Sequence, residues 1–168
     1  MRNRLLYWQI AGFVFTSIAG TLLHFLYKWS NQSTLVAPFS AVNESIWEHM
    51  KLLFVPMFVF ALIERKFIGA QYKNFWCVKL IGILFGIIMI PVLYYTYTGI
   101  SGVSKDWVNI IIFFAVAAAT YLLETWLFKN VNILCIAPLL AFFILCLLAL
   151  AFVVFTFVPP EIPLFQAP

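Results

Sequence analysis

Charged side chains are scarce in this sequence, and their scarcity excludes an ordinary soluble domain. Lys, Arg, Asp and Glu make up only 10% of its 168 residues, whereas 65% are hydrophobic. A soluble domain needs about 25% charged residues to cover its surface. Most of this surface must therefore face lipid. There is also no long polar segment, so we expect one integral membrane domain over residues 1–168, with the lipid bilayer as its main partner.

The motifs of several function classes are missing as well. There is no basic helix and no glycine-rich phosphate loop, so the net charge of +4 does not indicate a nucleic-acid partner. The HExxH zinc motif and the nucleophile elbow of serine hydrolases are also absent. The cysteines are Cys77, Cys135 and Cys146, an odd number without a CxxC pair. This pattern favours buried, unreactive thiols over a disulfide framework.

Five apolar segments have the length of membrane-spanning helices, which need about 20 residues. They cover residues 5–27, 46–64, 75–97, 107–128 and 133–158. The first is too long for a signal peptide and is followed by no cleavage site, so we interpret it as a retained helix. We therefore predict an all-α bundle of about five transmembrane helices. An extended, proline-rich tail is expected over residues 159–168.

The distribution of Lys and Arg predicts the orientation, because these residues are enriched in cytoplasmic loops. One set of loops and ends carries Arg2, Arg4, Arg65, Lys66, Lys73 and Lys129. The other set carries Lys28, Lys51 and Lys105. The N-terminus is therefore expected inside, and five spans then place the C-terminus outside.

The second segment carries charges at a depth where a membrane helix usually has none. Residues 52–63 are uncharged and make only about 18 Å of helix, but the hydrocarbon core is about 30 Å thick. The helix must therefore begin near Ile46, which puts Glu48, His49 and Lys51 inside the outer membrane edge. Charged groups there normally face the protein interior or a water-filled recess.

This reasoning predicts an outward-facing polar pocket. Helical spacing of i, i+4 and i+7 places Glu44, Glu48 and Lys51 on one face, and His24 in the first segment is expected at the same depth. The candidate pocket residues are His24, Asn43, Glu44, Glu48, His49 and Lys51. Two imidazoles and a carboxylate can bind a zinc-like divalent metal, for which the candidates are His24, His49 and Glu48. The same groups also suit a proton relay.

Helix capping is an alternative explanation for part of this pattern. Ser45 to Glu48 fits a capping box, in which Ser45 caps the helix and Glu48 bonds back to the Ser45 amide. Capping does not account for His49. At the other membrane edge, Lys79 and Glu124 have matching depths and are expected to form a structural ion pair between helices. Glu64 is expected at a solvated helix end.

Two stretches, "FSAVNESIWEHMKLLFVPM" and "FTFVPPEIPLF", carry a resemblance to a known family. The chain resembles an uncharacterised family of small bacterial membrane proteins, a domain of unknown function. The segment Asn43–Lys51 is the most specific part. The resemblance implies a polytopic helical fold in a bacterial cell membrane. It implies no activity, substrate or catalytic residue.

Three functions remain open at this point. The pocket can bind or conduct a cation, a proton or a small polar solute, and conduction would require a homo-oligomer because no internal repeat is visible. Alternatively, a metal in the pocket can activate water in an enzyme that acts on a lipid or prenyl substrate. In the third case, the protein is an accessory subunit whose polar residues are purely structural.

Overall fold

The structure is a computed structural model that describes residues 2–130 and 135–167. Within these residues there are five long helices and no strand. They are α1 (Arg2–Trp29), α2 (Ile46–Ile68), α3 (Phe75–Ser101), α4 (Asp106–Asn130) and α5 (Pro138–Phe157). Two short 3-10 helices, η1 (Gly69–Gln71) and η2 (Pro163–Phe165), complete the described structure. The predicted all-α bundle is thus confirmed.

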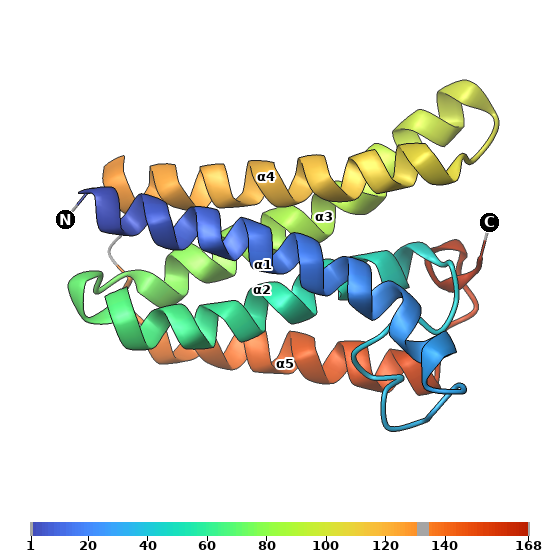
Figure 1. Ribbon diagram of the computed structural model, residues 1–168, viewed down its shortest axis with the longest axis horizontal. Coiled ribbons are helices and arrows are strands. Elements are labelled where there is room, and N and C mark those ends of the chain that lie inside the picture. The colour runs from blue at the N-terminus through green and yellow to red at the C-terminus, as the bar shows by residue number, and fades with distance from the viewer. Residues whose placement is uncertain (1, 131–134, 168) are drawn as a thin grey trace.

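The five helices lie side by side along one axis (Figure 1). Four of them, α1, α3, α4 and α5, are long and apolar enough to cross a membrane. The remaining helix, α2, carries five charged residues, namely Glu48, Lys51, Glu64, Arg65 and Lys66. It nevertheless runs the length of the bundle (Figure 1), and more than half of its residues are buried. The helix with the most charged residues is thus also the one with the largest share of buried residues.

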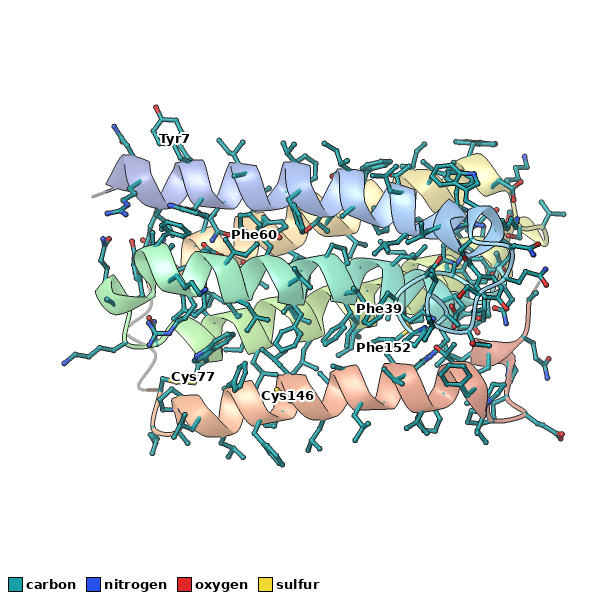
Figure 2. The ribbon with its side chains drawn as sticks, turned by 60° about the horizontal axis from the view of Figure 1, so that its bottom comes forward. Tyr7, Phe39, Phe60, Cys77, Cys146 and Phe152 are labelled. Atoms are coloured by element: carbon teal, nitrogen blue, oxygen red, sulfur yellow. A yellow bond between two sulfur atoms is a disulfide. The ribbon has the colours of Figure 1, made fainter. Side chains whose placement is uncertain are left out.

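Large apolar side chains cover the outside of the bundle. Leu122 is 70% exposed and Leu139 is 80% exposed. Figure 2 shows Tyr7 pointing away from the bundle, whereas Phe60 lies between α1 and α2. A soluble monomer rarely exposes so much apolar surface, whereas a bilayer solvates it. Together with the four apolar helices, this surface identifies a helical membrane protein.

Glycines allow α1 to approach its neighbours closely. A Cβ atom at Gly12 would lie 2.5 Å from the Tyr121 ring of α4 and 2.8 Å from the Phe60 ring of α2. At Gly20 it would lie 2.5 Å from the Phe113 ring. Small residues at such positions let membrane helices pack tightly.

The expectation of unpaired, buried thiols is wrong for two of the three cysteines. Cys77, at the start of α3, forms a disulfide with Cys135, while Cys146 is free. Figure 2 shows Cys77 at the end of the bundle where the chain begins. The two cysteines are separated by 58 positions. Cys135 lies between α4 and α5, which both pack against α3, and no local pattern encodes that packing.

The tail also differs from the extended segment that its prolines predict. It turns through η2, and the Phe165 ring lies 4.7 Å from Trp47 of α2 and 5.6 Å from Phe155 of α5, measured between ring centroids. Aromatic contacts therefore hold the tail against the bundle. Residue 168 of the predicted tail and residues 133–134 of the predicted fifth segment lie outside the described residues.

Candidate metal centre and its pocket

The end of α1 and the start of α2 meet at the end of the bundle opposite the N-terminus (Figure 1). Ser45 caps α2 by accepting a hydrogen bond from the Glu48 amide at 3.4 Å. The Ser45 amide donates to Asn43 Oδ1 at 2.9 Å, and not to Glu48. One half of the predicted capping box is therefore present. The turn leaves Glu44 just before the helix and places His49 in its first turns.

Three potential metal ligands converge at this place. His24 of α1, Glu44 of the preceding loop and His49 of α2 offer ligand atoms that all lie within 4.8 Å of one another. The distance from His24 Nε2 to Glu44 Oε2 is 3.8 Å. Ligands of a tetrahedral zinc ion lie roughly 3.3 Å apart, given bonds of about 2.0–2.2 Å. The Glu44 side chain is 50% exposed and so has room to close the difference.

The hydrogen bonding of His49 prepares it to act as a ligand. Its Nδ1 lies 2.9 Å from the Ser45 carbonyl oxygen. A carbonyl can only accept, so Nδ1 carries a proton, and in the neutral ring the lone pair is then on Nε2. Metal-binding histidines characteristically donate their other ring N–H to a carbonyl or carboxylate in this way. The start of α2 thus sets both the position and the tautomer of His49.

The three side chains border a cavity of about 410 Å³ between α1, α2 and α4. Its polar wall also includes Thr21, Asp106 and Asn109, while Phe25, Phe113 and Phe114 contribute to its apolar wall. Few polar groups in a mainly apolar cavity are typical of small-molecule sites. Asn109 and the phenylalanines of α4 were not among the predicted pocket residues. Their periodic pattern on α4 is that of any membrane helix, so only packing reveals their role.

Glu48 and Lys51 lie elsewhere in the structure. Lys51 Nζ is 2.7 Å from Glu48 Oε2, and it donates to the Ala37 carbonyl at 3.0 Å and to Thr156 Oγ1 at 2.8 Å. Glu48 Oε2 also accepts from the Val42 amide at 3.0 Å. The pair is buried and ties the loop before α2 to α5. It is therefore a structural contact.

The assignment of Glu48 as the carboxylate ligand thus differs from the arrangement observed, in which Glu44 lies beside the histidines. α2 begins at Ile46, as expected, but neighbouring residues of a helix point about 100° apart, so His49 borders the cavity while Glu48 contacts Lys51 and the Val42 amide. Glu44 precedes the helix, so helical periodicity does not relate it to Glu48. Asn43 does not border the cavity either. Its carboxamide oxygen accepts the hydrogen bond from the Ser45 amide.

Comparison with known proteins identifies the family of the chain but assigns no function to it. One family model matches residues 2–168. The chain belongs to DUF6512, a family of unknown function. This confirms the resemblance to an uncharacterised family that the stretch Asn43–Lys51 suggested. No curated protein and no solved structure matches the chain.

This DUF6512 protein has a second buried polar cluster at the opposite end of the bundle. Lys79 Nζ of α3 lies 2.5 Å from Glu124 Oε2 of α4 and 2.6 Å from Glu64 Oε2 of α2. Gln9 of α1 donates to Glu64 Oε1 at 2.8 Å. The pairing of Lys79 with Glu124 is the one proposed from their depths. Glu64 is fully buried, although the charged run Glu64-Arg65-Lys66 suggested a solvated helix end.

Proposed function

We propose that this protein binds a divalent metal ion of the zinc type in the pocket between α1, α2 and α4. The observation that carries the proposal is the convergence of His24, Glu44 and His49 within 4.8 Å. Two imidazoles and one carboxylate match the donor set of many zinc sites. The Ser45 carbonyl accepts the supporting hydrogen bond from His49 Nδ1.

We further propose that the protein lies in a bacterial cell membrane with this pocket facing outward. A bilayer solvates the exposed apolar surface, and the resemblance named above implies a bacterial cell membrane. The excess of Lys and Arg at the other end of the bundle favours an outward-facing pocket. A single chain supplies all three ligands and the cavity wall, so metal binding requires no homo-oligomer.

Titration of the detergent-purified protein with Co²⁺ tests the metal site. Tetrahedral Co²⁺ has strong visible absorption bands, so it reports both binding and geometry. We expect one equivalent to bind and Zn²⁺ to displace it. Glu44→Gln should weaken binding at least about tenfold, because the site loses its only anionic ligand. Glu161→Gln is the matched control, since Glu161 is an exposed carboxylate in the tail.

The two histidine variants complete the test. His24→Ala and His49→Ala should each abolish the tetrahedral Co²⁺ spectrum while the helical content, measured by circular dichroism, stays unchanged. If the wild-type protein shows no such spectrum, or if the spectrum survives in both variants, the proposal is wrong.

The cavity favours a second candidate, a metal-dependent hydrolase for an amphipathic substrate. Three protein ligands leave a coordination position for water, as in catalytic zinc sites. The adjoining cavity of about 410 Å³ has an aromatic wall suited to an apolar chain. Release of a fluorescent product from phospholipid or prenyl ester analogues, dependent on both Zn²⁺ and His49, would support an enzyme. A loaded metal site without turnover would leave binding as the function.

A further inference from the structure

The cluster of Glu64, Lys79 and Glu124 has an unbalanced charge. All three side chains are at most 2% exposed. If all were ionised, two carboxylates and one ammonium would leave a net charge of −1 inside the bundle. Burying an uncompensated charge is strongly unfavourable, and two carboxylates that share one site do not both ionise readily.

No other cation compensates this charge among the described residues. The groups that face the cluster are Gln9 of α1, Tyr121 of α4 and Tyr72 after η1. The nearby Arg65 of α2 is exposed, and it lies over the Phe75 ring at 5.8 Å. In the part of the chain that the structure describes, Lys79 is the one cation paired with either carboxylate.

The hydrogen bonding distinguishes the two carboxylates. Glu64 Oε1 accepts a hydrogen bond from the Gln9 amide, and Glu64 Oε2 forms an ion pair with Lys79 Nζ at 2.6 Å without a hydrogen bond of its own within the described residues. Glu124 receives only Lys79, on Oε2, and its buried Oε1 has no hydrogen-bond partner within the described residues. Both oxygens of Glu64 thus contact a donor or a cation, whereas only one oxygen of Glu124 does, and such contacts stabilise the ionised form of a carboxylate. The unpaired oxygen of Glu124 is therefore the favoured place for a proton.

We propose that Glu64, Lys79 and Glu124 form a proton-binding site inside the bundle, with the proton on Glu124. Its protonation makes the cluster neutral, since Glu64 and Lys79 then form a single ion pair. The proton site draws on three helices, α2, α3 and α4, and a fourth helix, α1, supports Glu64 through Gln9. It shares no residue with the candidate metal centre, so it is independent of the function proposed above.

Infrared spectroscopy of the purified protein at neutral pH tests this site. A protonated carboxyl group has a C=O stretching band that carboxylates lack. We expect one such band in the wild-type protein, and ¹³C labelling of glutamate should shift it. The labelling excludes Asp106, the one aspartate in the chain. No shifted band in the wild-type protein would overturn the proposal and would favour a bound monovalent cation as the neutralising charge.

Variants then locate the proton. Glu124→Gln should remove the band, because glutamine imitates the protonated acid. Glu64→Gln should also remove it, because the remaining Glu124 then pairs with Lys79 as an ionised carboxylate. Glu161→Gln is the control and should keep the band. A band that persists in Glu124→Gln would overturn the assignment to Glu124. If Glu124→Gln does not fold, the labelled wild-type and Glu64→Gln spectra still decide the question.

Discussion

The two buried lysines of this protein have different surroundings. Lys51 has three oxygen partners, one for each of its N–H groups, namely Glu48, the Ala37 carbonyl and Thr156. Lys79 instead lies between two carboxylates and three aromatic rings. A fully satisfied ion pair stabilises one arrangement of the chain. A lysine that pairs with two carboxylates neutralises only one of them, so the second carboxylate is neutral only when it binds a proton.

Loss of the Lys51 ammonium is expected to destabilise the fold strongly. Lys51→Met keeps most of the side-chain volume but leaves Glu48 as an unpaired buried carboxylate. Breaking a buried pair in this way costs about 3–5 kcal/mol. The measurement is thermal unfolding in detergent micelles.

Lys105→Met is the matched control for this variant, because Lys105 is exposed in the turn before α4. It should unfold at the wild-type temperature. Equal stability of the two variants would show that the Lys51 contacts do not hold the loop and α5 together.

At the scale of the helices, the close approach of α1 to α2 and α4 depends on small residues. Gly12, Thr16 and Gly20 lie on the buried side of α1, and Thr16 Oγ1 is 2.8 Å from the Tyr121 hydroxyl. This packing positions His24 beside α2. The pocket at one end of the bundle therefore depends on contacts made further along α1.

Gly12→Ala is expected to destabilise the bundle by about 1–3 kcal/mol, as overpacking of a close contact does. The added methyl group would lie 2.5 Å from Tyr121 and 2.8 Å from Phe60. Gly99→Ala is the control, because no atom lies within 4 Å of its added Cβ. The control should be neutral or stabilising by up to about 1 kcal/mol. Unfolding curves for both variants that match the wild type would rule out tight packing at Gly12.

For the molecule as a whole, two features favour opposite orientations in the membrane. The end that contains Arg4, Arg65 and Lys73 is the basic one, and basic ends normally face the cytoplasm. The same end contains the Cys77–Cys135 disulfide, and disulfides normally persist outside the cytoplasm.

We predict that the distribution of Lys and Arg determines the orientation in the membrane, so that the C-terminus lies outside. In bacteria, a C-terminal alkaline phosphatase fusion should then be active and a C-terminal green fluorescent protein fusion should be dark. The reverse fusion pattern, with a fluorescent protein fusion and an inactive phosphatase fusion, would establish that the end with the disulfide faces outward.

Much of the fold and part of the site were predictable from the sequence. The helix positions follow from runs of apolar residues, and the burial of Glu48 and Lys51 follows from the cost of charge in a bilayer. His24 and His49 were selected because both were expected at one depth. Glu48 was chosen over Glu44, but Glu48 pairs with Lys51 and the loop residue Glu44 lies beside the histidines, because side-chain direction at these positions depends on packing. The disulfide and the folded tail depend on contacts between distant segments.

That this chain is a helical membrane protein follows from its amino-acid sequence alone, because hydrophobic length and the scarcity of charge are properties of single segments. The sequence also limited the candidate chemistry to a few polar side chains. Only the tertiary structure decided which of them meet. In the structure, Glu44 lies beside the two histidines and Lys51 forms an ion pair with Glu48. Glu64 joins the ion pair of Lys79 and Glu124. Each of these outcomes depends on the rotation and neighbours of a helix, which local sequence patterns do not specify.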